Sequence, residues 1–255
     1  MISKHSFIND KSQIGKNLNI DAFSVIHENV EIGDNCWIGS NVTIFPGARI
    51  GNNCKIFPGS VISGEPQDLK FENGDTLTFI GNNTIIRECV TINRATMTTK
   101  KTIVGSNCFI MAYCHIAHDC EIHDEVVLVN NASLAGCVKI EKGAILGGFS
   151  LVHQFCKVGQ YSFSAMGSSI GKDIPAFVRV SGSPAFPRGL NTTGIQRLNL
   201  GKEVSDGLKE AYKILYLRNF KLKDAINEIS KKLNKISEVE ILLDSIKASE
   251  RGIVR

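Results

Sequence analysis

The stretch IGSNVTIFPGARIGNNCKI, from Ile38 to Ile56, places an isoleucine at every sixth position. A period of six matches neither the 3.6 residues of a helical turn nor the two-residue repeat of a plain strand. It does match a chain that bends after each short strand. The same aliphatic spacing extends over residues 2–62, 80–92 and 104–170, and Ser164 is the only polar anchor of the last series. Hexapeptide repeats of this kind predict a parallel β-helix.

Small side chains mark a second position of the repeat, four residues after the anchor, as at Ser24 and Ala48. Glycine often follows the anchor directly, as at Gly33 and Gly51, where we expect a positive φ in a tight bend. Most of the cysteines fall at the small position, so we predict buried thiols and neither disulfides nor metal ligands. These six are Cys36, Cys54, Cys108, Cys114, Cys120 and Cys156.

The repeat is interrupted near residues 63–79 and 95–101, which we predict to be external loops where function tends to reside. Beyond Ile170 the six-residue period ends. Apolar stripes predict helices over 203–218, over 222–233 and from Ser237. Ser237 would form a capping box with Glu240 at the start of the third helix. We expect a β-helix over residues 1–187 and a three-helix domain over 188–255. That domain would cover the column's C-terminal end or pack on neighbouring subunits.

The net charge of +4 lies entirely in residues 190–255, with 13 Lys plus Arg against nine Asp plus Glu. Such a basic end suits an acidic partner, although an ordinary solvated helical surface has the same composition. The excess is too small to indicate nucleic-acid binding. No apolar run approaches the ~18 residues of a membrane span. Because the repeat begins at Ile2 and leaves no room for a signal peptide, we expect a cytoplasmic protein.

Residues 18 apart share a corner of successive coils, so His118, Gly136 and Gln154 should stack in a column ~9.6 Å long. A histidine suits general-base chemistry near neutral pH, and a backbone N–H at Gly136 is a donor for a developing oxyanion. Asp119 would orient the imidazole if the pair lies at the bend. The surface formed by His118, Gly136 and Gln154 favours direct acyl transfer from a thioester. The alternative is that His118 is a plain surface histidine.

Six segments of the chain together resemble the UDP-N-acetylglucosamine O-acyltransferase family of the hexapeptide acyltransferases. They are QDLK (67–70), IRECVTINR (86–94), HIAHDC (115–120), NNASLAG (130–136), VHQF (152–155) and RGIVR (251–255). The resemblance implies an all-β left-handed parallel β-helix with a C-terminal α-helical domain. It implies transfer of an R-3-hydroxyacyl chain from acyl carrier protein to the 3-hydroxyl of UDP-GlcNAc, which begins lipid A biosynthesis. The donor is a phosphopantetheine thioester, with no cofactor and no metal, and the family is a homotrimer with sites between subunits.

Carried onto this sequence, the family motifs make His118 the general base, Asp119 its partner and the Gly136 amide the oxyanion donor. The resemblance also implies two sets of substrate-binding residues. The acceptor sugar or its phosphates would contact His115, His153 and Gln154, and the nucleotide and other polar parts of the ligands would contact Asp68, Lys70, Asn191 and Arg197. Met166 would stack above Gly148 as the residue that limits acyl-chain length, which implies a preference for a shorter chain.

The chain departs from the family pattern where Cys137 and Asn93 replace usual histidines and where Thr193 replaces an acidic residue. These changes leave the acceptor open, and the alternative is an N-acyltransferase that acts on a 3-amino sugar nucleotide with an acyl carrier protein or coenzyme A donor.

Two further classes fit the column but lack their residues. A zinc carbonic anhydrase would use His118 and His123, but its third histidine position holds Asn82. A non-enzymatic solenoid would show a flat face of repeated Thr or Ser, and the sequence has none.

Overall fold

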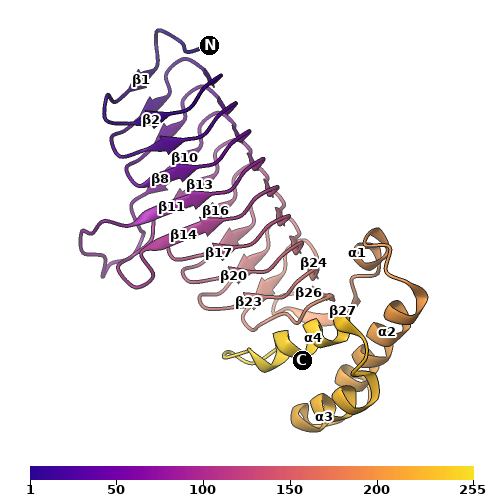
Figure 1. Cartoon of the computed structure of the whole chain (residues 1–255). Helices are drawn as coiled ribbons and strands as arrows, with labels where there is room; N and C mark the ends of the chain where they lie inside the picture. Colours follow the sequence, from indigo (N-terminus) through magenta and orange to yellow (C-terminus); the bar gives the residue numbers. More distant parts are fainter.

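The computed structural model describes residues 1–255 and shows a triangular column of stacked coils with helices at one end (Figure 1). Each coil adds one short strand to each of three sheets, so the parallel β-helix predicted from the hexapeptide spacing is confirmed. The first sheet contains β1 (Phe7–Ile8), β4 (Val25–Ile26), β7 (Thr43–Ile44), β10 (Val61–Gly64), β13 (Thr91–Asn93), β16 (His115–Ile116), β19 (Ser133–Leu134), β22 (Leu151–Val152) and β25 (Ser169–Ile170). The second sheet contains β2 (Gln13–Ile14), β5 (Glu31–Ile32), β8 (Ala48–Ile50), β11 (Leu77–Ile80), β14 (Lys101–Val104), β17 (Glu121–Ile122), β20 (Lys139–Ile140) and β23 (Lys157–Val158). The third sheet contains β3 (Asn19–Ile20), β6 (Trp37–Ile38), β9 (Lys55–Ile56), β12 (Ile85–Ile86), β15 (Phe109–Ile110), β18 (Val127–Leu128), β21 (Ile145–Leu146), β24 (Phe163–Ser164), β26 (Val178–Ser181) and β27 (Phe186–Leu190).

The aliphatic anchors fill the interior of the column. Neighbouring coils pair anchor with anchor, as Ile116 does with Leu134, so each isoleucine packs on the same position of the next coil. Ser164, the polar exception, is fully buried, and its hydroxyl shares a 2.8 Å hydrogen bond with Ser150 and accepts one of 3.2 Å from the Gly147 amide. This interior hydroxyl is therefore satisfied, as buried polar groups require.

The glycines that follow the anchors have a different cause from the predicted one. Positive φ occurs two residues later in the bend, at residues such as Asn35 and Asn53. A Cβ at Gly33 would lie 2.8 Å from the carbonyl carbon of Gly51 and 2.4 Å from a side-chain oxygen of Asn52. Glycine is needed there because the next coil passes too close for any side chain, and the expected backbone conformation was wrong.

The predicted burial of the six cysteines at the small-residue position is confirmed. All eight cysteines are free thiols, and the six at the small-residue position are buried. The other two are the exposed Cys89 and the half-buried Cys137.

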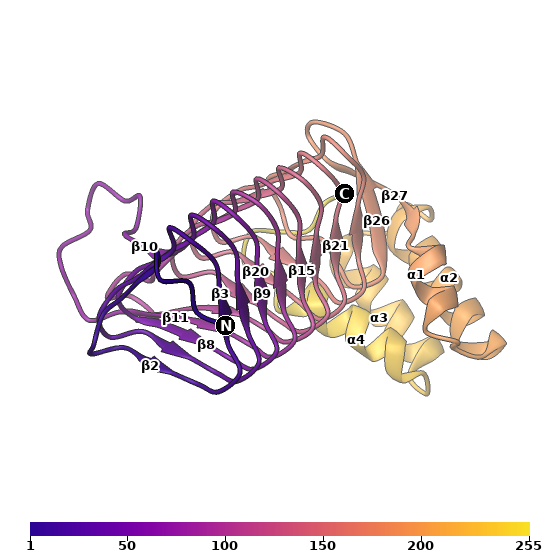
Figure 2. The ribbon, with the colours of Figure 1, turned by 90° about the horizontal axis from the view of Figure 1, so that it is seen from above.

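One edge of the column, where the chain passes from the first sheet to the second, carries both interruptions of the repeat. We call this edge the loop corner. The long loop, residues 65–76, leaves it between β10 and β11, and the short loop, residues 94–100, leaves it one coil later between β13 and β14. The next coil carries His118 at the same edge, between β16 and β17. Figure 2 shows the long loop projecting from the side of the column.

The C-terminal part contains four helices instead of three: α1 (Thr192–Arg197), α2 (Lys202–Tyr216), α3 (Leu222–Leu233) and α4 (Ser237–Lys247). The first has six residues, which is too short for a recognisable apolar stripe. The predicted capping box is wrong, because the N-cap of α4 is Ile236 and the Ser237 hydroxyl bonds to Glu238. Before the helices, β27 pairs antiparallel to β26 and spans residues on both sides of position 187.

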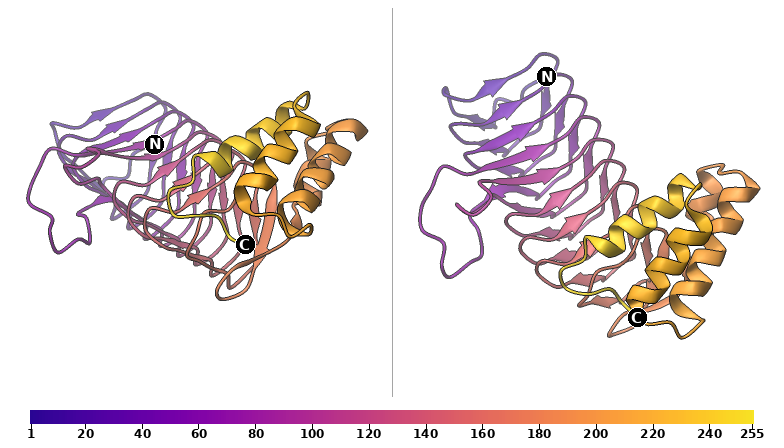
Figure 3. Two further views of the ribbon diagram at one scale, coloured as in Figure 1. Left: turned by 90° about the horizontal axis from the view of Figure 1, so that it is seen from below. Right: turned by 60° about the horizontal axis from the view of Figure 1, so that its bottom comes forward.

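The helical part covers the end of its own column (Figure 3). The amide of Ala176 donates to the Ser245 hydroxyl of α4, and the Lys157 ammonium donates to the carbonyl of Ala248. Past α4, the Val254 amide donates to the carbonyl of Asp173 in the last coil. These contacts cover backbone groups that an open column end would expose. None of the four helices has the length and apolar character needed to cross a bilayer.

Candidate active site

His118 and Asp119 form a hydrogen-bonded pair at the loop corner. Asp119 adopts a left-handed φ of 60°, and this bend turns two adjacent side chains toward each other where a flat strand would separate them. The distance from His118 Nδ1 to Asp119 Oδ2 is 2.7 Å. The aspartate side chain is almost completely buried, whereas the imidazole is 18% exposed and can meet a ligand.

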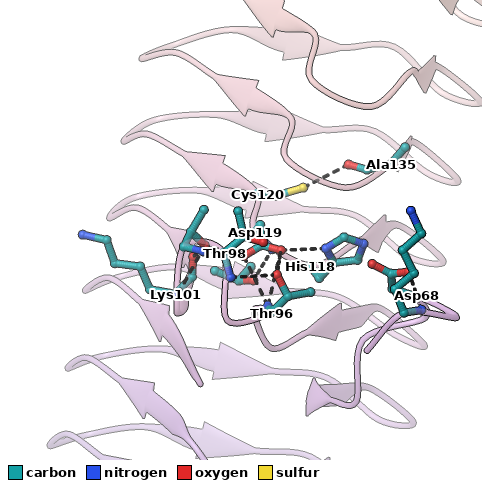
Figure 4. Close-up of polar contacts among 11 residues, drawn as sticks. Asp68, Thr96, Thr98, Lys101, His118, Asp119, Cys120 and Ala135 are labelled. Carbon is teal, nitrogen blue, oxygen red and sulfur yellow. Dashed lines mark hydrogen bonds and ion pairs between the residues drawn. The ribbon is translucent and has the colours of Figure 1, made fainter. Parts of the chain in front are cut away.

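The short loop holds the Asp119 carboxylate (Figure 4). The Thr96 hydroxyl donates to Oδ2 at 2.8 Å, the Thr99 hydroxyl donates to Oδ1, and the amides of both threonines also donate to the carboxylate. The Asp119 amide in turn donates to the Thr102 hydroxyl at 2.9 Å. Sequence reasoning missed this clamp. The available signal was three threonines in a short loop one coil before the histidine.

The charge of Asp119 fixes the proton arrangement of the pair. Burial raises the pKa of this carboxyl, but the hydrogen bonds from Thr99, His118 and Thr96 outweigh burial and leave the pKa below its usual range. The ionised carboxylate only accepts hydrogen bonds, so Nδ1 of His118 carries the proton and Nε2 presents a lone pair. This is the tautomer that a general base requires.

Gly136 lies one coil beyond His118 at the same corner, where Cys137 donates its amide to the His118 carbonyl at 3.0 Å. A Cβ at Gly136 would lie 2.6 Å from Cε1 and 2.7 Å from Nε2 of the imidazole. The Gly136 amide donates no hydrogen bond within the protein. An unpaired N–H beside the basic nitrogen is the arrangement needed to stabilise an oxyanion.

A groove of about 820 Å³ opens over this pair. It brings together most of the predicted substrate-binding residues, namely Asp68, Lys70, His115 and Gln154, with His118, Asp119 and Gly136. In Figure 4 the imidazole lies between Asp119 and Asp68 of the long loop. Sequence reasoning missed several residues of the groove wall: Gln67, Thr96, Thr98, Leu151 and Phe155.

His115 lies in the groove wall on β16, the strand that leads to His118. Its Nδ1 is 2.7 Å from the Thr91 hydroxyl. Burial, with a smaller contribution from the charge of His118, lowers the pKa of His115. A neutral imidazole is therefore favoured here, which suits hydrogen bonding to a polar ligand more than ion pairing.

Cys137 and Asn93, the two positions expected to be histidine from the family pattern, differ in their surroundings. Cys137 lines the groove, and burial together with the charges of Asp119 and Asp68 raises the pKa of its thiol. Asn93 is buried outside the groove wall, where its amide donates to the carbonyl of Glu65 at 2.8 Å. Only the cysteine changes the chemistry of the groove, and the asparagine anchors the base of the long loop.

Four predicted ligand-binding residues lie outside the groove of a single chain. His153 is exposed beside it. Asn191 is the N-cap of α1, where its side chain accepts from Gly194 and donates to the Tyr161 carbonyl. Arg197 is exposed in a second cavity with Asn191, against the third sheet. Met166 is 78% exposed at the edge between the third and first sheets.

Comparison with known proteins agrees with this geometry. Residues 173–254 match the model described as UDP N-acetylglucosamine O-acyltransferase, domain 2, and residues 11–46, 31–64 and 101–136 match hexapeptide repeats. The acyl-[acyl-carrier-protein]–UDP-N-acetylglucosamine O-acyltransferase of Pseudomonas syringae pv. tomato is 43% identical over 197 residues, 77% of this chain and 76% of the relative. A UDP-N-acetylglucosamine acyltransferase structure from Bacteroides fragilis superposes with a TM-score of 0.98 at 39% identity, over all of both chains. That of Francisella novicida gives 0.95 at 39% identity, over all of this chain and 94% of the other.

Proposed function

The chain belongs to the UDP-N-acetylglucosamine O-acyltransferase family, and we propose that its groove moves an R-3-hydroxyacyl chain from acyl carrier protein to the 3-hydroxyl of UDP-GlcNAc. The observation that carries this proposal is the wall of His118, Asp119 and Gly136, because it joins an oriented base to a free backbone donor. The relatives are named O-acyltransferases, which supports ester formation and not the alternative amide. We further propose that the reaction takes place in the cytoplasm, as the first step of lipid A biosynthesis.

The proposed reaction needs only groups that the chain and its substrates supply. Nε2 of His118 removes the proton of the sugar 3-hydroxyl as the oxygen attacks the thioester carbonyl. The Gly136 amide donates to the resulting oxyanion, and Asp119 stabilises the imidazolium. Collapse of the intermediate breaks the C–S bond, and the imidazolium returns its proton to the phosphopantetheine thiolate. The thioester is already activated, so the proposal includes no cofactor and no metal.

Two of the three outer faces of the column differ in polarity, which supports a homotrimer. Most of the outward side chains of the second sheet are charged, as at Glu31, Lys139 and Lys157. Those of the third sheet are apolar over five successive coils: Ile85, Phe109, Val127, Ile145 and Phe163. A continuous apolar stripe of this length marks an interface. Three prisms packed around a threefold axis would cover it.

A shared site explains the two separated cavities. The cavity with Asn191 and Arg197 includes Ile145 and Phe163 of the apolar stripe, whereas the His118 groove lies at the loop corner. If the loop corner of one subunit faces the third sheet of the next, Arg197 supplies a cation for nucleotide phosphates from the neighbouring chain. His153, exposed at the groove edge, then faces the same space.

We predict that Val127→Glu dissociates the trimer, because a carboxylate on the stripe would be buried without a partner. Sedimentation of the unmodified protein at micromolar concentration should give three times the 27.9 kDa chain mass, and the variant should sediment as a lighter species with little activity. Lys139→Glu on the charged face is the matched control and should remain trimeric. A fully active monomer of the unmodified protein would contradict the shared site.

We predict that Met166→Gly shifts the acyl preference toward longer chains. Met166 stacks over Gly148, since the Gly167 amide donates to the Gly148 carbonyl at 2.8 Å, and it faces the space between subunits in the proposed trimer. Each extra buried CH₂ contributes ~0.8 kcal/mol, so room for four more carbons is equivalent to about 3 kcal/mol of binding. Competition between carrier proteins loaded with short and long chains measures the shift. Met166→Leu should keep the original preference, and an unchanged ratio in Met166→Gly would remove Met166 from the groove end.

Mass spectrometry of the product tests the proposed function directly. The trimer is incubated with 3-hydroxyacyl carrier protein and UDP-GlcNAc, and then with the 3-amino analogue of the sugar. The proposal expects an alkali-labile ester of UDP-GlcNAc. Formation of only an alkali-stable amide from the analogue would reject it in favour of the N-acyltransferase.

A further inference from the structure

Three potential metal ligands of different chemistry converge in the groove. A ring nitrogen of His118, a carboxylate oxygen of Asp119 and Sγ of Cys137 lie within 4.8 Å of one another. The convergence follows from the fold, because His118 and Asp119 occupy the loop corner of one coil and Cys137 stacks above Asp119 in the next. Cys137 is half-buried, and its thiol makes no hydrogen bond in the structure.

The Asp119 contacts divide these groups into direct ligands and a supporting one. Both oxygens of Asp119 already accept hydrogen bonds, from Thr96, Thr99 and Nδ1 of His118. The carboxylate therefore orients the imidazole and strengthens Nε2 as a donor, which is the usual carboxylate–histidine arrangement behind zinc ligands. Nε2 and the Cys137 sulfur remain as direct ligands. Zinc bonds to nitrogen and sulfur are ~2.0–2.3 Å long, so the proposed site requires the Cys137 side chain to rotate until an ion can bridge its sulfur and Nε2.

Charge in the groove also favours a cation. Asp119 and Asp68 line the groove together with Cys137, so two carboxylates give the site a negative potential before any ion binds. A bound divalent cation stabilises the thiolate form of Cys137 over the thiol. The thiol proton passes to solvent as the metal–sulfur bond forms. The soft sulfur selects Zn²⁺ or Cd²⁺ over Mg²⁺ or Ca²⁺.

We propose that Cys137 and His118, supported by Asp119, form an inhibitory site for a thiophilic divalent cation such as Zn²⁺. Two protein ligands leave positions for water on the groove side of a tetrahedral ion. Metal on Nε2 removes the lone pair that would deprotonate the acceptor, so turnover stops while the ion is bound. The inhibitory consequence rests on the proposed acyltransferase function, whereas the binding itself does not.

Cadmium titration of the intact protein tests binding without any activity measurement. The titration is done in a Cys89→Ser background, which leaves Cys137 as the only thiol that is not buried. We expect a thiolate-to-cadmium charge-transfer band that saturates at one ion per chain. The band should disappear in Cys137→Ser and in Cys137→Asn, the latter because asparagine tolerates the left-handed bend at this position. Asp119→Asn should weaken cadmium binding roughly 10- to 100-fold, the range for outer-shell partners of a metal ligand.

Zinc inhibition of acyl transfer is the second measurement. Zn²⁺ should inhibit the Cys89→Ser enzyme reversibly, with activity restored by a chelator, and inhibition by Mg²⁺ should be absent. A charge-transfer band that persists after removal of Cys137, or no band at all, would overturn the proposed site. Equal zinc sensitivity with and without the Cys137 thiol would do the same. A protein that binds cadmium through Cys137 but transfers no acyl group would instead reject the proposed function and leave the metal site standing.

Discussion

His118→Ala is expected to lower kcat by roughly 10²- to 10⁴-fold, the contribution of a positioned general base. The imidazole is oriented by the 2.7 Å bond from Nδ1 to Asp119, which leaves Nε2 free beside the Gly136 amide. The side chain lies at a corner outside the anchor positions, so its loss should leave the column folded. Steady-state kinetics with circular dichroism on the same preparation measure both effects.

His123→Ala is the matched control for this substitution. His123 is an exposed histidine at the next corner of the same coil, where its ring pairs with Glu121 at 3.2 Å outside the groove. Its removal should leave kcat within twofold or so of the starting value, as surface substitutions away from a site usually do. Near-normal turnover in folded His118→Ala would take this histidine out of the mechanism.

Gly136→Ala is expected to lower kcat roughly 10²-fold or more, because misplacement of a catalytic group by about 1 Å has this effect. The added Cβ would meet the imidazole at 2.6 and 2.7 Å, so the ring must rotate away from Asp119 or the corner must move. Either adjustment separates Nε2 from the Gly136 amide. Stability should change little, since the contact is with a partly exposed ring at the loop corner and not with the core.

Gly171→Ala is the control for this substitution. It distinguishes the clash with the His118 ring from any general loss of activity that alanine causes at the loop corner. Gly171 lies at the loop corner two coils further on, and a Cβ there would meet nothing within 4 Å. The control should retain full activity. If Gly136→Ala keeps normal turnover as well, the close approach of the histidine to the glycine has no catalytic role.

The column itself was predictable because aliphatic residues recur at a fixed spacing of six. The same spacing correctly stacked His118, Gly136 and Gln154, since an interval of 18 residues returns the chain to the same edge. What the period could not give is the conformation of segments that leave it. The hydrogen bonds of Thr96 and Thr99 to Asp119 depend on how the short loop folds back, which no repeat specifies.

Residue type was also an incomplete guide to role. Asn191, which was expected to contact a nucleotide, also caps α1 and donates to the Tyr161 carbonyl, so its side chain has a structural role in its own chain. Asn93 was taken as a change in the acceptor pocket, yet it supports the loop that carries Asp68. In both cases a polar side chain satisfies backbone groups of its own chain, a demand that becomes visible only when the partners are in place.

The concentration of both loops at one corner has a consequence for how such a chain can change length. Within the column, gain or loss of a single hexapeptide would rotate every later coil by a third of a turn and carry His118 to a different face. The two loops avoid this because each leaves the loop corner and returns to it, so the strands that follow stay in phase. Changes in the length or sequence of these loops leave the rest of the column in phase, and the groove lies at the same corner. New specificity can therefore arise there while the rest of the column keeps its frame.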